Sequence, residues 1–75
     1  MTKTNVTQAI LDSIRENRVV ELTAKLDTQE WVDAAHELSL ASEDYNEERT
    51  AKGLERDYWG TDDDGDAFRV RLIGE

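Results

Sequence analysis

The stretch that decides the fold is residues 58–73, which read YWGTDDDGDAFRVRLI. Its second half alternates apolar and charged residues, the period-two pattern of a strand with one buried face. The apolar positions of that alternation are Phe68, Val70 and Leu72. The Asp64-Gly65 pair before it supplies the positive φ that tight hairpin turns require. These residues predict a β-hairpin in the last third of the chain.

The loop length of this hairpin decides which side chains share the buried face. A two-residue loop places Trp59 opposite Val70, and a four-residue loop places Trp59 opposite Phe68. Both registers put Trp59 on the apolar face, so we expect it in the core. The opposite face is then expected to carry Tyr58, Arg69 and Arg71.

An amphipathic helix is expected over residues 6–16. Apolar side chains recur there at spacings of three and four residues, which places them on one helical face. They are Val6, Ala9, Ile10 and Ile14. Asn5 or Thr4 has a side chain that can cap the first turn, and Asn17 tolerates the left-handed conformation that ends many helices.

A strand is expected over residues 18–26, because the apolar period changes from helical spacing to alternation. The alternating apolar residues are Val20, Leu22, Ala24 and Leu26. The pair Val19-Val20 is β-branched, which also favours a strand. A continuation of the helix, which would gather Val19, Leu22 and Leu26 on one face, is the alternative.

The strongest helical signal lies in the middle of the chain, where apolar residues fall within an arc of about 100°. They are Trp31, Ala34, Ala35, Leu38 and Tyr45. Asp27 and Glu30 have the spacing of a capping box, and Gly53 followed by Leu54 is typical of a helix C-terminus. We therefore predict a helix over residues 28–52, with fraying after about residue 45 as the alternative.

These elements predict one α+β domain over residues 1–75, in the order α-β-α-β-β. We expect a three-stranded, mainly antiparallel sheet with both helices packed on one face. The expected core consists of Val6, Ile10, Ile14, Val20, Leu22, Leu26, Trp31, Ala35, Leu38, Trp59, Phe68, Val70 and Leu72. The apolar residues left outside it, as candidates for a self-association or partner surface, are Val19, Val32, Leu40 and Ile73.

The amino-acid composition excludes several classes of site and of function. The 75 residues include 18 Asp and Glu, 9 Lys and Arg and no Cys, for a net charge of −9. Without cysteine there is no disulfide framework and no thiolate metal site. No long apolar run or signal-peptide pattern occurs, so we expect a soluble cytoplasmic protein. Because acids repel phosphates, we expect no direct binding to nucleic acid or to a membrane.

The acids are concentrated in residues 27–66, which hold 14 Asp and Glu but only Arg49, Lys52 and Arg56 as bases, a local net charge of −11. On a continuous helix, five of them fall in a stripe about 60° wide and about 27 Å long. These are Glu30, Asp33, Glu37, Asp44 and Glu48. The hairpin acids that could extend this field are Asp62, Asp63, Asp64 and Asp66. These nine residues form the predicted partner-binding surface, and a merely solvated acidic face is the alternative.

The hairpin acids do not fit an EF-hand calcium loop. With Gly65 as the sixth residue, Gly60 stands first and Arg71 twelfth, whereas a start at Asp62 puts Ala67 sixth. We therefore predict no metal or other cofactor. A loose divalent site on the carboxylates of this loop is the alternative, and its ligands would be Asp62, Asp64 and Asp66.

Signals for catalysis are equally weak. His36 is the single histidine and projects away from the apolar stripe of the predicted helix. The sequence also lacks a nucleophile elbow and a glycine-rich phosphate loop. We therefore expect that the protein is not an enzyme.

The sequence predicts a non-enzymatic acidic module that binds a basic surface on another protein. A row of carboxylates resembles a phosphate backbone in sign and spacing, so its most specific form is a nucleic-acid mimic. Such a protein would inhibit a nucleic-acid-binding protein, as inhibitors encoded by phages and mobile elements do. One alternative is a homo-oligomeric accessory protein, at its simplest a homodimer, that associates through its surplus apolar residues. Another is an antitoxin or immunity-type partner of a basic toxin.

Overall fold

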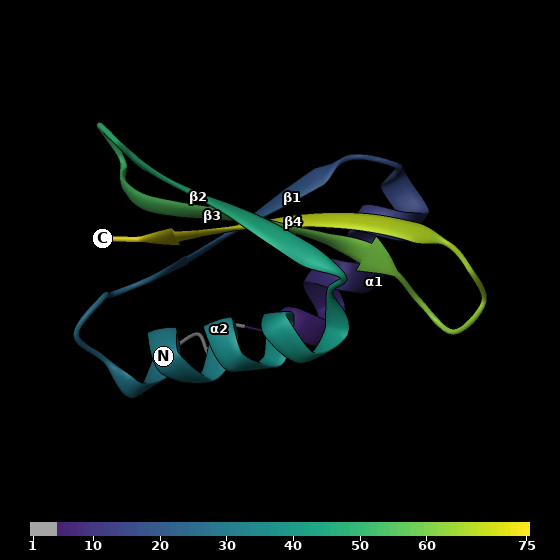
Figure 1. The fold of residues 1–75 in the computed structure, drawn as a ribbon, viewed down its shortest axis with the longest axis horizontal. Coiled ribbons are helices and arrows are strands. Elements are labelled where there is room, and N and C mark those ends of the chain that lie inside the picture. Colours follow the sequence, from purple (N-terminus) through teal and green to yellow (C-terminus); the bar gives the residue numbers. More distant parts are fainter. Residues whose placement is uncertain (1–4) are drawn as a thin grey trace.

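Residues 5–75, which the computed structural model describes, form two helices and a four-stranded mixed sheet. The elements are α1 (Val6–Glu16), β1 (Val19–Ala24), α2 (Gln29–Ala41), β2 (Asp44–Thr50), β3 (Gly53–Thr61) and β4 (Ala67–Gly74). The strand order is β1-β4-β3-β2, in which β1 runs parallel to β4 and the other pairs are antiparallel. Both helices lie on one side of the sheet and leave its other face open (Figure 1). The small α+β class is confirmed, whereas the three-stranded sheet is wrong.

The bounds predicted for α1 are confirmed, because both of its caps form. Asn5 Oδ1 accepts a hydrogen bond from the backbone N–H of Gln8 at 3.0 Å. At the other end Asn17 adopts the left-handed conformation with φ 52°. Thr4, the alternative cap, lies outside the described residues.

A buried serine ties α1 to the sheet. Ser13 Oγ donates to the carbonyl of Arg18 at 2.7 Å and accepts the backbone N–H of Arg69 at 2.8 Å. Arg69 belongs to β4, so one hydroxyl joins the last turn of the helix to an inner strand of the sheet. The segment predicted as a strand over 18–26 is a strand over Val19–Ala24 rather than a continuation of the helix.

The start of α2 lies close to the prediction, but its end does not. Thr28, rather than Asp27, caps the helix, and its Oγ1 accepts the backbone N–H of Trp31 at 3.4 Å. The buried stripe is confirmed for Trp31, Ala34, Ala35 and Leu38 but is wrong for Tyr45, which is exposed and lies beyond the helix. The helix ends at Ala41, so both the predicted extension to residue 52 and the predicted fraying after residue 45 are wrong.

Strand β2 replaces the second half of the expected helix. Ser42 turns to an extended conformation, with its backbone N–H donating to the carbonyl of Leu38 at 2.9 Å. The chain then passes close to Gly60 of β3, where a Cβ atom would lie only 3.0 Å from the backbone nitrogen of Glu43. Gly53, with φ 131°, follows the turn between β2 and β3 and does not end a helix as predicted.

The loop between β3 and β4 contains five residues, 62–66, and this odd number reverses the predicted faces. Tyr58 pairs with Val70, and Trp59 pairs with Arg69. Because successive strand residues point to opposite faces, a shift of one residue exchanges the two sides of β3. Tyr58 is therefore 0% exposed in the core, whereas Trp59 lies half-buried on the open face. The prediction of Trp59 inside and Tyr58 outside is wrong.

Asp62 accounts for the length of this loop. Its Oδ1 accepts the backbone N–H of Asp64 at 3.0 Å and that of Asp66 at 2.8 Å. Its own N–H donates to the carbonyl of Asp66 at 3.0 Å, and Gly65 adopts φ 84°. An Asp side chain that bonds to the backbone two residues ahead makes an Asx turn, which competes with the tighter hairpin turns.

The core lies between the helices and the covered face of the sheet. Its buried members are Val6, Ala9, Ala24, Trp31, Ala34, Ala35, Leu38, Tyr58, Phe68, Val70 and Leu72. Partly buried residues packed against it are Ile10, Ile14, Val20, Leu22, Leu26 and Leu54. Ile73, which we expected outside the core, is buried as well, although it lies on the open-face side of β4.

Leu72 provides a test of this packing. It is 0% exposed, so Leu72→Ala is expected to lower the free energy of unfolding by about 2–5 kcal/mol through lost burial and a residual cavity. Leu40 is 75% exposed, and Leu40→Ala should change that free energy by no more than about 0.5 kcal/mol. Urea denaturation of both variants measures the difference, and equal losses would contradict the packing.

Candidate functional site

The open face of the sheet carries an ion-pair network centred on Arg71. Its Nε donates to Asp57 Oδ1 at 2.7 Å and lies 3.6 Å from Glu55 Oε1, while Nη1 lies 3.2 Å from Glu21 Oε2. The hydrogen bond to Asp57 is the main cause that raises the pKa of the Arg71 guanidinium. Lys52 Nζ approaches Glu21 at 3.8 Å. The acids at the centre of this face are thus paired with bases.

A second arginine, Arg56, lies on the helix side of β3. Its Nε donates to Glu47 Oε1 at 2.6 Å and its Nη1 to the hydroxyl of Tyr58 at 3.2 Å. Its guanidinium carbon lies 5.6 Å from the ring centre of Trp31 and 5.5 Å from that of Tyr45. Burial lowers the pKa of Arg56, but the hydrogen bonds to Tyr58 and Glu47 outweigh it, so the pKa is raised. This cluster joins α2 to β2 and neutralises one more acid.

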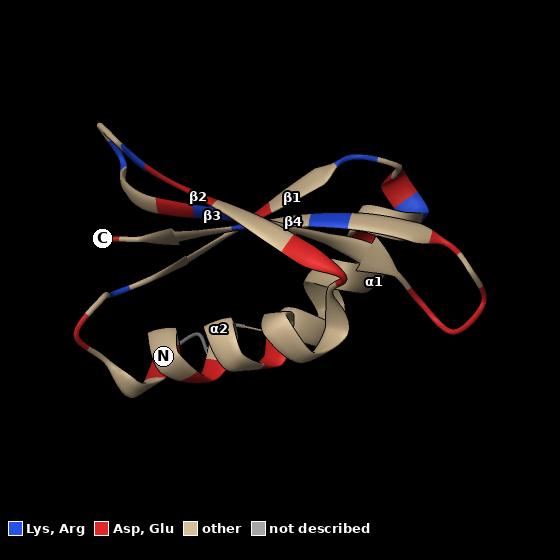
Figure 2. Cartoon of the chain, viewed as in Figure 1, with Lys and Arg blue, Asp and Glu red and all other residues tan. Residues whose placement is uncertain are grey.

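The nine acids predicted as one partner-binding surface fall into three groups. Three remain on α2, two lie on β2 and four occupy the loop between β3 and β4 (Figure 2). In that order they are Glu30, Asp33 and Glu37, then Asp44 and Glu48, then Asp62, Asp63, Asp64 and Asp66. The single helical ridge is wrong, because α2 ends before residue 44. The role of these acids in binding stays a prediction.

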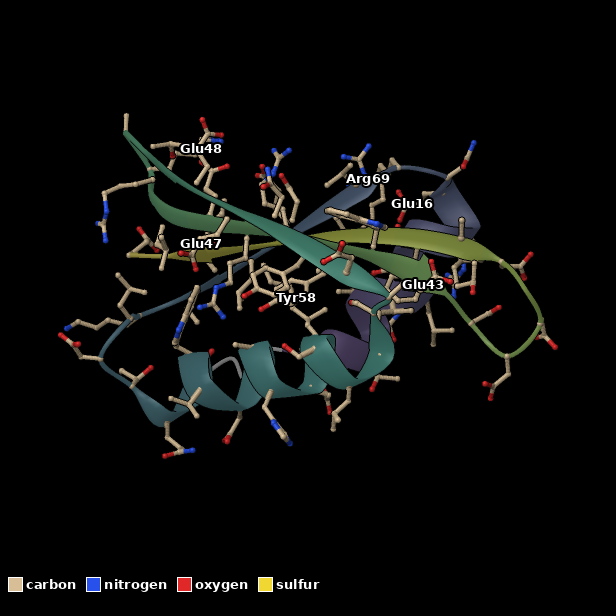
Figure 3. The ribbon with its side chains drawn as sticks, in the orientation of Figure 1. Glu16, Glu43, Glu47, Glu48, Tyr58 and Arg69 are labelled. Carbon is tan, nitrogen blue, oxygen red and sulfur yellow. The ribbon has the colours of Figure 1, made fainter. Side chains whose placement is uncertain are left out.

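Pairing of β2 with β3 brings two of these groups to the same end of the sheet. Asp44 pairs with Trp59, only three residues before the loop begins. Glu43 lies at this junction, with its backbone N–H donating to the carbonyl of Trp59 at 2.9 Å (Figure 3). Its Oε1 also accepts from the hydroxyl of Thr61 at 3.5 Å. We call Glu43, Asp44 and the loop acids Asp62, Asp63, Asp64 and Asp66 the acidic corner.

A surface groove of about 520 Å³ adjoins the acidic corner. It is lined by Glu43, Trp59, Gly60, Thr61, Ala67, Phe68 and Arg69. Sequence reasoning missed Trp59 because it placed this residue in the core, and missed Glu43 because a helical projection puts it off the acidic stripe. The mixture of aromatic walls with one acid and one base suits an amphipathic side chain, whose stem packs on the rings while its charged end stays near water.

Among residues 5–75, salt bridges neutralise acids of α1, β1, β2 and β3 but none of the acids in the acidic corner. The acids in salt bridges within residues 5–75 are Glu16, Glu21, Glu47, Glu55 and Asp57. None of the six carboxylates of the acidic corner forms a salt bridge within this part of the chain. The sequence contains no Lys or Arg between Lys25 and Arg49, which leaves the corner without a nearby base from α2 or its flanks.

Three loop carboxylates, those of Asp62, Asp64 and Asp66, come close enough to contact one cation, with ligand atoms within 4.8 Å of one another. Asp62 Oδ1, however, already accepts two backbone N–H groups, and the side chains of Asp64 and Asp66 are exposed. The hydrogen bonds of the turn account for this arrangement. We therefore do not assign the cluster as a metal centre.

Comparisons with protein-family models, with curated proteins and with solved structures found no match to this chain. Within residues 5–75, neither helix combines the length and apolarity needed to cross a membrane. The function must therefore be inferred from the chemistry of the surface itself.

Arg71 tests the ion-pair network. Arg71→Gln leaves Glu21, Glu55 and Asp57 without their shared cation, and is expected to lower the free energy of unfolding by about 1–3 kcal/mol. The loss should shrink in about 1 M NaCl, which screens repulsion among the carboxylates.

The matched control for this change is Arg69→Gln. Arg69 lies two residues away on the same face of β4, is exposed, and forms no salt bridge within residues 5–75. Its loss should alter the free energy of unfolding by less than about 0.5 kcal/mol. Similar losses from the two variants in thermal or urea denaturation would show that the network does not stabilise the sheet.

Proposed function

We propose that this chain is a non-enzymatic interaction module that occupies the basic, nucleic-acid-binding surface of another protein. The observation that carries the proposal is the acidic corner, where six carboxylates from two segments gather without a salt bridge among residues 5–75. Such a field attracts a basic groove and repels phosphates. The exposed acids Asp33 and Glu37, with Glu30, extend the field along α2, and Glu48 extends it along β2.

The proposed mechanism is electrostatic competition. A groove that binds nucleic acid places Lys and Arg side chains at the spacing of phosphates, and the carboxylates of the corner pair with those side chains instead. The neighbouring groove offers Trp59 to the stem or guanidinium plane of an arginine, which adds a contact that phosphates cannot make. Inhibitors of this kind, encoded by phages or mobile elements against nucleic-acid-binding proteins, are the most specific form of the proposal.

Neutralising the corner tests the proposal. The protein is immobilised and used to capture partners from an extract of its native host. The corner variant carries Glu43→Gln, Asp63→Asn and Asp64→Asn, and leaves Asp62 to hold the turn. We expect the wild type to capture a nucleic-acid-binding protein that duplex DNA displaces, and the corner variant to retain at least about tenfold less of it, the equivalent of 1.4 kcal/mol.

The control variant changes the net charge equally but at the opposite end of the sheet, next to the turn between β2 and β3, through Asp27→Asn, Ala51→Lys and Glu75→Gln. It should capture the partner about as well as the wild type, because long-range charge is screened beyond about 10 Å at moderate salt. If both triple variants capture equally less of the partner, the acids of the whole surface contribute to binding and the acidic corner has no special role. The proposal would be contradicted if salt and DNA do not weaken capture and the corner variant captures as much partner as the wild type. Capture of a basic toxin would favour the antitoxin alternative.

A second candidate function is supported by exposed apolar side chains on α2. Leu40 is 75% exposed and Val32 is 53% exposed, which fits a homo-oligomeric accessory protein. Ile73, which we also expected to take part, is buried and unavailable. Under this alternative, sedimentation shows a dimer that persists in high salt and dissociates on Leu40→Glu, whereas the main proposal expects a monomer at high concentration.

A further inference from the structure

Strand β2 is an open edge of the sheet. It pairs with β3 on one side, and the sheet ends at its other side. Six of its seven residues are exposed, and β3 is the one element among residues 5–75 against which it packs extensively. The hairpin of β2 and β3 projects away from the helix layer (Figure 1). An edge of this kind presents unpaired backbone groups to an incoming strand.

The hairpin turn fixes which of these backbone groups point outward. Thr50 pairs with Gly53 across a two-residue turn, so this closing pair exchanges its hydrogen bonds inside the hairpin. Hydrogen-bonded and non-hydrogen-bonded pairs alternate along an antiparallel ladder. Counting back along β2, the residues whose N–H and C=O groups point away from β3 are Tyr45, Glu47 and Arg49.

A side-chain contact agrees with this assignment. The backbone N–H of Tyr45 donates to Asp44 Oδ1 at 2.8 Å, as an outward N–H can. The N–H groups of Glu47 and Arg49 therefore remain as the donors of the edge, with the carbonyls of Tyr45, Glu47 and Arg49 as acceptors. Main-chain groups of this kind are the ones with which an added strand forms its hydrogen bonds.

Charge favours one class of incoming strand. Asp44 and Glu48 are four residues apart, so both lie on the open-face side of β2 (Figure 3 labels Glu48 there). An antiparallel second copy centred on Glu47 would set this carboxylate opposite itself and double the excess of acids, which is unfavourable. A segment with Lys or Arg at alternate positions would instead place its bases beside Asp44 and Glu48.

We propose that β2 accepts an added strand from a partner protein, in the form of an extended segment with Lys or Arg at alternate positions. Backbone hydrogen bonds to Glu47 and Arg49 provide the affinity, and the alternate basic side chains provide the selectivity. The expectation that the partner segment is basic rests on the function proposed above. The open edge of β2 is independent of that function. The added strand lies along β2, next to the acidic corner.

The test compares two substitutions at Arg49, whose side chain forms no salt bridge within residues 5–75. Arg49→Ala and Arg49→Pro both remove the charge, but only proline removes the outward N–H, and it leaves the ladder to β3 intact. The probe is the peptide acetyl-KTKVKTK-amide, with acetyl-ETEVETE-amide as its acidic counterpart. We expect the basic peptide to bind the wild type and Arg49→Ala within threefold of each other and Arg49→Pro at least tenfold more weakly, and the acidic peptide to bind none.

A second measurement does not depend on the fold of a variant. A basic peptide N-methylated at alternate residues on its pairing edge keeps its charge but cannot donate to β2, and it should bind the wild type at least tenfold more weakly than the unmethylated peptide. Equal binding of the two peptides would overturn the strand-addition proposal. The function proposed above would still stand if the corner variant loses the captured partner, and would fail separately if that variant retains it.

Discussion

Strand β4, which contributes side chains to the core on one face and to the ion-pair network on the other, is the element on which the rest of the structure depends. Its alternate residues Phe68, Val70 and Leu72 point to the helices and form the centre of the core. Arg71, between them, points to the open face and pairs with acids of both neighbouring strands. Because a strand alternates its side chains, a single register of β4 fixes the apolar layer and the ion-pair network together. Docking of α1 also depends on it, through the bond of Ser13 to the N–H of Arg69.

Signals between near neighbours in the sequence predicted a large part of the fold. The caps of α1, the alternation in β1 and β4 and the buried stripe of α2 each depend on residues a few positions apart. The strand β2 could not be predicted in this way, because Asp44–Thr50 is polar and becomes a strand by pairing with β3. The register of β3 was missed for a related reason. The side chain of Asp62 sets an odd loop length, and one residue exchanges Tyr58 with Trp59.

The same distinction between local sequence signals and long-range pairing applies to the candidate site. The excess of acids over residues 27–66 is readable from the sequence, since no folding step changes the number of charges. Their arrangement is not, because it was projected on a helix that ends at Ala41. Glu43 and Trp59 meet only through the pairing of β2 with β3, which no local pattern encodes. Salt bridges to Arg56 and Arg71 neutralise Glu47 and Asp57, whereas the acidic corner forms no salt bridge among residues 5–75.

The salt dependence of the association rate with the captured partner tests the central claim most directly. If the acidic corner steers binding to a basic surface, the rate constant of the wild type falls steeply as NaCl rises, and neutralising Glu43, Asp63 and Asp64 flattens that dependence. The dissociation rate should change less than the association rate, because exposed charges act mainly during the approach of the two proteins. An association rate that varies equally with salt in the wild type and in this variant would contradict the account.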